Sequence, residues 1–181
     1  IKLYRSDASD LRWRFATIDL ELSLQPGGWS DCYDNGLEHV RNEGENDLFV
    51  GAWNRCYENN EYRIYFINRF ADLNNTLYKV DRLLSIEQKY FDEWSLEMPK
   101  EFARWGDPWD VQGQMNEFFD RHIYFQEEIE CKTEVVRDQI EDVLELDGQF
   151  DLYLDVLPVG AGTIHLNTIE PSDYPWEGVY Y

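Results

Sequence analysis

The spacing of apolar residues changes once along the chain, and this change limits the folds that the chain can adopt. Between residues 47 and 146, apolar residues recur at steps of three and four, which is the period of amphipathic helices. From Gly148 onward the period is two, as in half-buried strands. The sequence therefore predicts an α+β fold, with a helical body between two β regions.

The N-terminal region predicts a β-hairpin. Residues 1–5 alternate between apolar and polar, residues 6–10 resemble a turn, and residues 13–24 resume a strand-like pattern. Asp19 and Glu21 are expected on one face of the second strand, because side chains repeat every two residues along a strand.

A long loop and then a series of helices are expected through the middle of the chain. Residues 25–46 hold many Gly and Asn and predict the loop. The last helix is predicted either as one long helix or as two abutting ones. The predicted helices cover residues 47–58, 61–73, 80–94, 99–105 and 111–146.

The C-terminal segment predicts a small β unit. Residues 150–156 and 163–167 are the expected strands, joined through residues 158–162. We therefore divide the chain into a main portion, residues 1–147, and a β extension packed on it, residues 148–181.

The aromatic content and the net charge of the chain indicate which classes of partner it can bind. Aromatic residues make up 16% of the chain, which is too much apolar surface for a disordered acidic segment. Acidic residues outnumber basic ones by 37 to 16, and the net charge is −21. Such a surface repels phosphate backbones and anionic lipid headgroups, so nucleic acid is not an expected partner. No apolar run is long enough to span a membrane.

Three cysteines allow two arrangements. Cys32, Cys56 and Cys131 lack the spacing of a zinc site and are too few for a disulfide framework. The first expectation is three buried free thiols. The alternative is one disulfide with one thiol left over.

Several motifs follow one another in a fixed order. Residues 1–5 read IKLYR, and residues 12–24 read RWRFATIDLELSL. Later motifs are FINRFADLNNT at 66–76, EMP at 97–99, ARWG at 103–106, Asn167, and YPWEGVYY at 174–181. This series resembles the CotH family (spore coat protein H-like) of atypical protein kinases, in which a K-L-Y-R strand leads to a W-R-F strand carrying two Asp residues. The resemblance covers nearly the whole chain.

The resemblance implies the later part of a kinase-like fold, with a helical body similar to the C-terminal lobe. Asp19 would take the role of the metal-binding Asp, and Glu21 stands where the family usually has a second Asp. The implied cofactor is magnesium with ATP. The catalytic-loop Asp and Asn and the nucleotide-binding lobe are expected ahead of Ile1, so the isolated chain is expected to be inactive.

The family resemblance also suggests partners and a location. The implied substrate is Ser or Thr of a coat or surface protein, and the upstream part of the same protein is a further expected partner. The implied location is extracellular, at the cell surface or in the spore coat.

Other readings of the same residues stay open. Asp19 and Glu21 could be the polar face of a half-exposed strand, paired with arginines such as Arg14. Glu is one methylene longer than Asp, and magnesium requires near-octahedral geometry, so a catalytically dead kinase-like interaction or adhesion module is the alternative function. A weaker alternative is a glycan-binding domain that uses some of the tryptophans.

Overall fold

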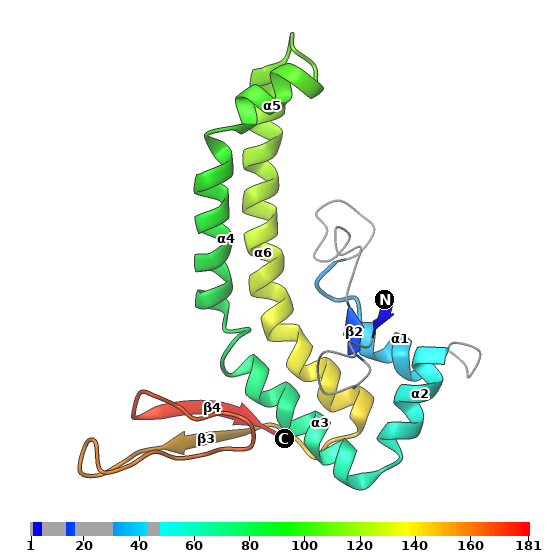
Figure 1. Cartoon of the computed structure of the whole chain (residues 1–181), viewed down its shortest axis with the longest axis vertical. Coiled ribbons are helices and arrows are strands. Elements are labelled where there is room, and N and C mark those ends of the chain that lie inside the picture. Colours follow the sequence, from blue (N-terminus) through cyan, green and yellow to red (C-terminus); the bar gives the residue numbers. More distant parts are fainter. Residues whose placement is uncertain (1, 5–13, 17–30, 43–47) are drawn as a thin grey trace.

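The structure is a computed structural model that describes residues 2–4, 14–16, 31–42 and 48–181 (Figure 1). The described residues form short antiparallel strand pairs and a larger helical body, which agrees with the predicted α+β class. The helices are α1 (Gly36–Asn42), α2 (Leu48–Tyr57), α3 (Asn60–Asn74), α4 (Val80–Ser95), α5 (Met98–Trp105) and α6 (Val111–Leu144). The strands are β1 (Lys2–Tyr4), β2 (Arg14–Ala16), β3 (Phe150–Leu154) and β4 (Trp176–Tyr180).

Side-chain caps explain where the predicted helices begin. Asn59 accepts a hydrogen bond from the Tyr62 backbone N–H (3.0 Å) at the start of α3. Asp110 accepts one from the Gly113 N–H (3.0 Å) at the start of α6. Helix α6 then continues over 34 residues, so the single-helix alternative is confirmed.

The hydrophobic core lies where α2, α3 and the end of α6 meet. Tyr57, Ile140 and Leu144 are its buried centre. Trp53 stacks on Tyr57 with ring centroids 4.9 Å apart, and Phe66 meets Trp53 edge-on at 5.4 Å. Each such side chain contributes about 1.5 to 3 kcal/mol by leaving water, so aromatic residues of α2 and α3 hold the helices together.

Helices α4, α5 and α6 form an arm that extends away from this core (Figure 1). Helix α4 runs antiparallel to the first half of α6, and α5 crosses at the far end. Phe91 stacks between the two long helices on Phe118 (5.2 Å) and His122 (3.6 Å). His122 Nδ1 also lies 2.7 Å from a carboxylate oxygen of Glu87, so α4 and α6 are joined by a polar contact beside the rings.

The N-terminal hairpin is present in its described part. Strands β1 and β2 pair antiparallel, with Lys2 opposite Ala16 and Tyr4 opposite Arg14. The rest of the predicted second strand lies outside the described residues.

The predicted pairing of the C-terminal strands is wrong. Strand β3 pairs antiparallel with β4, so that Phe150 faces Tyr180, and residues 163–167 form no strand. Instead, Leu166 and Ile169 bridge across a tight turn in which Asn167 has a φ of 50°. A local two-residue period does not identify a strand's partner, which is here set by contacts of the turn and of β4 with α3.

The predicted loop over residues 25–46 is also partly wrong. Residues 36–42 form α1, which the Asn35 side chain caps by accepting from the Glu38 N–H (3.0 Å). The turn residues at 34–36 therefore start a helix. Residues 25–30 and 43–46 lie outside the described residues.

The expectation of three free thiols is wrong. Cys32 and Cys131 form a disulfide across 99 residues, with Cα atoms 5.8 Å apart, while Cys56 is free and exposed. Lys132 holds the same turn on α6, because its Nζ donates to the backbone oxygens of Cys32 (3.1 Å) and Asp34 (2.6 Å). The turn before α1 is thus docked on the middle of α6.

The expected boundary between residues 147 and 148 falls in the connection between α6 and β3, and it stays a prediction. Within the described ranges, the helices include none with the length and apolarity needed to cross a membrane.

We expect Cys131→Ser to lower the free energy of unfolding by about 2 to 4 kcal/mol, because the bridge restricts a long loop in the unfolded chain. Urea unfolding monitored by circular dichroism measures this. Cys56→Ser is the matched control and should leave the midpoint unchanged. If Cys131→Ser unfolds at the same urea concentration as the unmodified chain, the expected role of the disulfide is contradicted.

Candidate functional site

Both sequence-predicted metal ligands, Asp19 and Glu21, lie outside the described residues. The described part of their strand ends at Ala16, three residues before Asp19. Elsewhere, within the part of the chain that the structure describes, no three His, Cys, Asp or Glu side chains gather closely enough to hold a metal ion. The metal site therefore stays a prediction from the sequence.

The most organised polar group among the described residues is built around Asp72 on α3. Its side chain has no exposed surface. One carboxylate oxygen accepts from the Thr168 backbone N–H (2.9 Å) and from Thr168 Oγ1 (2.6 Å). The other accepts from the Tyr180 hydroxyl (2.7 Å). A buried carboxylate requires such donors, so this cluster replaces the water that Asp72 loses on folding.

Asn75, one turn further along, continues the cluster to β4 and α6. Its side-chain oxygen accepts from the Val179 N–H (3.0 Å) and from Arg137 Nη2 (3.0 Å), and its amide nitrogen donates to the Val179 oxygen (2.8 Å). Asn75 thus pairs with β4 as a neighbouring strand would. We call these five residues the Asp72 cluster: Asp72, Asn75, Arg137, Thr168 and Tyr180.

The pKa values of two neighbouring tyrosine hydroxyls, Tyr180 of the cluster and Tyr181 next to it, are raised. Burial, and then the hydrogen bond to Asp72, raise the pKa of the Tyr180 hydroxyl well above its ordinary value. Burial also raises the pKa of Tyr181 to about 12. Tyr180 therefore remains a donor to the Asp72 carboxylate even at a pH at which an exposed tyrosine begins to ionise.

The sequence reasoning did not single out the Asp72 cluster, although a signal was present. Asp72 and Asn75 lie in the motif at residues 66–76, and Tyr180 lies in the motif at 174–181. The structure brings these two segments together through Thr168, which follows Asn167. Residues of these segments form one hydrogen-bonded joint between α3, α6 and β4.

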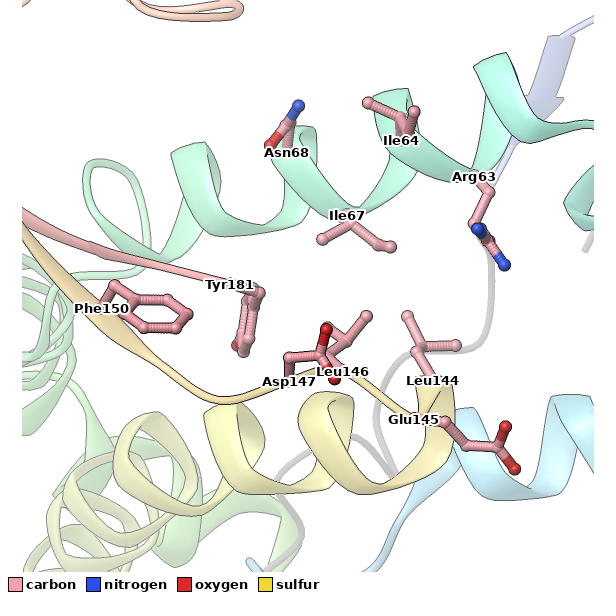
Figure 2. A pocket seen from close by; sticks show the side chains of 10 residues that line it. All are labelled: Arg63, Ile64, Ile67, Asn68, Leu144, Glu145, Leu146, Asp147, Phe150 and Tyr181. Carbon is pink, nitrogen blue, oxygen red and sulfur yellow. The ribbon is translucent and has the colours of Figure 1, made fainter.

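A pocket of about 590 Å³ lies next to this joint, between α3 and the connection from α6 to β3 (Figure 2). Figure 2 shows Ile67 pointing from α3 into the space above Leu146, with Tyr181 at one end and Arg63 at the other. Glu145 and Asp147 add carboxylates to the rim. The volume is in the range of small-molecule sites, and the floor suits an apolar group.

The chemistry of this pocket is limited by its side chains. Its described lining contains no Ser, Cys or His beside a carboxylate, so it offers no nucleophile with an adjacent base. The Tyr181 hydroxyl faces the backbone oxygen of Arg137 (3.3 Å). The pocket therefore offers an apolar floor and rim carboxylates to a bound group.

Comparison with known proteins adds nothing to this geometry. No family model, curated protein or solved structure matches the chain.

We expect Asp72→Ala to lower the free energy of unfolding by about 3 kcal/mol or more, because several buried donors lose their acceptor at once. Urea unfolding of the variant measures the loss. Asp151→Ala, which removes an exposed acid from β3, is the matched control and should change stability by about 0.5 kcal/mol or less. Equal losses in the two variants would contradict a structural role for the cluster.

Alkaline pH should destabilise the fold through Tyr180 and Tyr181. Their pKa values are raised above the ordinary 10.0, so the unfolded chain releases these protons at lower pH than the folded one. The stabilisation is complete below about pH 10 and is lost as pH rises toward about 12. Urea unfolding at a series of pH values should show this decline, with a smaller slope in a variant carrying Tyr180→Phe and Tyr181→Phe. The exposed Tyr153→Phe, as control, should keep the full slope.

Proposed function

We propose that this chain is the C-terminal part of a CotH-like atypical Ser/Thr protein kinase, which transfers a phosphoryl group from magnesium-bound ATP to a coat or surface protein. The observation that carries the proposal is the series of spaced motifs, in one order, from Ile1 to Tyr181. The nucleotide lobe and catalytic loop belong ahead of Ile1 in this proposal. The chain alone is then inactive.

The Asp72 cluster supports the proposal. Motif segments that are about 100 residues apart in the sequence meet in one network, through Asp72, Asn75 and Tyr180. Residues that fix the packing of α3, α6 and β4 are the ones that a shared fold would retain. Chance likeness of separate short motifs gives no reason for them to converge in space.

The β1–β2 pairing also supports the proposal. Leu3 lies opposite Phe15 in the antiparallel register, so residues of both N-terminal motifs lie side by side. A carboxylate just beyond such a strand is what magnesium-assisted phosphoryl transfer uses to hold the metal on the nucleotide phosphates. Asp19 would supply that ligand. Glu21 would be the second ligand, displaced by its extra methylene.

The second candidate function is a kinase-like interaction or adhesion module that has lost catalysis. Glu21 favours this function, because the family usually has Asp at that position. The arm also favours it, because its far end exposes several large aromatic side chains. In this case the scaffold of α3, α6 and β4 presents a binding surface, and no phosphoryl transfer is expected.

We expect Asp19→Ala to weaken magnesium–ATP binding about tenfold or more in a protein that includes the residues preceding Ile1, because the metal loses an anionic ligand. Isothermal titration calorimetry measures binding, and mass spectrometry of a basic Ser-rich peptide measures phosphoryl transfer. Asp151→Ala, which removes an exposed acid from β3, is the matched control.

The same titration separates the two candidate functions. Equal nucleotide binding by Asp19→Ala and the unmodified protein would remove Asp19 from the site. Absence of both binding and transfer in the unmodified protein would favour the interaction module.

A further inference from the structure

We propose that the far end of the α4–α6 arm is a docking site for a basic polypeptide segment that also carries apolar side chains. The site consists of four exposed residues around α5, which we call the aromatic tip: Trp94, Leu96, Trp105 and Trp109. This docking is separate from phosphoryl transfer and holds whether or not the chain belongs to an active kinase.

The four side chains of the aromatic tip are much more exposed than large apolar side chains that pack in a core. Trp94 is 59% exposed, Leu96 75%, Trp105 70% and Trp109 94%. All four lie in the short stretch from the end of α4 to the start of α6, at the end of the arm most distant from the core (Figure 1). Large apolar side chains that stay exposed within one short stretch of chain favour an interaction surface, and tryptophan is the residue type most often central to one.

These side chains do not hold the arm together. Helix α5 packs on α4 and α6, and on its inner side Phe102 is half-buried while Met115 of α6 is buried. Two of the rings make contacts near their own backbone: Trp94 lies 5.6 Å from Tyr90 between ring centroids, and Arg104 lies over the Trp105 ring. More than half of the surface of each ring-bearing residue is still exposed.

The loop that carries Trp109 is held in one conformation. Asp107 Oδ1 accepts from the Trp109 N–H (2.9 Å). The Gln114 side chain accepts from the Asp107 N–H (3.1 Å) and donates to the Asp107 oxygen (2.8 Å). A partner that binds Trp109 therefore pays little conformational entropy, because the loop is ordered in advance.

Charge identifies the partner as basic. The three basic side chains of the stretch from residue 89 to 110 are already engaged: Lys100 pairs with Glu97 (2.8 Å), while Arg104 and Lys89 lie over the rings of Trp105 (4.8 Å) and Tyr90 (5.7 Å). Six carboxylates belong to the same stretch: Asp92, Glu93, Glu97, Glu101, Asp107 and Asp110. The local field is thus negative.

The aromatic rings add a second preference for cations. Arg104 and Lys89 show that rings of this region accept a cation on their faces. A partner that offers Arg or Lys next to Leu or Ile would place its cations in the negative field of the stretch and its apolar side chains on the exposed rings. Arg is the better match, because its planar guanidinium both stacks and pairs with carboxylates.

The same charges disfavour other occupants. A second copy of the chain brings a net charge of −21 and an identical acidic tip, so association through this site is opposed by like charge. An anionic vesicle or a nucleic acid is repelled for the same reason. A basic polypeptide gains both from the net negative charge of the stretch and from the exposed rings.

The test is fluorescence anisotropy of a labelled peptide of about 15 residues, with Arg on one helical face and Leu on the other, titrated with the 181-residue chain. We expect binding that weakens about tenfold or more when Trp105→Ala and Trp109→Ala are combined. Glu93→Gln with Glu101→Gln should weaken binding several-fold and reduce its dependence on salt.

Tyr153→Ala is the matched control, since Tyr153 of β3 is as exposed as Trp94 and lies outside the arm. It should leave the affinity unchanged, and circular dichroism should show all variants folded. Binding by the tryptophan variant equal to that of the unmodified chain would overturn the proposal, as would equal binding of a peptide in which Glu replaces Arg. Light scattering that shows dimers dependent on Trp109, or glycan-array binding without peptide binding, would also overturn it. The assay contains no nucleotide, so its failure leaves the kinase proposal untouched.

Discussion

The structure depends on one buried carboxylate. Asp72 has no contact with solvent, and a charge in that position is tolerated only when donors surround it. Thr168 and Tyr180 supply those donors, one from the turn at residues 166–169 and one from β4. Asp72 thus helps to fix the turn and β4 on α3, together with the hydrogen bonds of Arg69 to Thr168 and of Asn75 to Val179. Asn75 links α3 to α6 as well, because its side-chain oxygen accepts a hydrogen bond from Arg137.

Features with a local cause were predictable from the sequence. The helices α2 to α6 match their predicted segments within about two residues at most ends, because a helix depends on a repeat and a cap that lie close together in the chain. Features with a distant cause were not. The partner of β3, the disulfide between Cys32 and Cys131, and the docking of the turn before α1 all depend on residues far apart in the sequence.

The candidate site residues also fall into those suggested by a local sequence pattern and those that depend on distant segments. Strand periodicity and resemblance single out Asp19 and Glu21, and both stay predictions. The motif at residues 66–76 predicts a helix, but its sequence does not reveal that Asp72 and Asn75 point to a buried joint while Arg63 and Ile67 border a pocket. A helix carries several faces at once, and which face meets which neighbour is decided only when the distant segments have folded onto it.

The continuity of α6 has a mechanical consequence. At 34 residues the helix is roughly 51 Å long, and it touches the core at one end and α5 at the other. Proline is absent from it, and its one glycine, Gly113, lies in the first turn, so no weak point lets the two ends bend independently. The disulfide at Cys131 attaches α6, partway along its length, to the turn that contains Cys32. A force on the distal end would rotate α6 about the disulfide. The resulting displacement would reach Arg137 in the Asp72 cluster and Ile140 in the hydrophobic core.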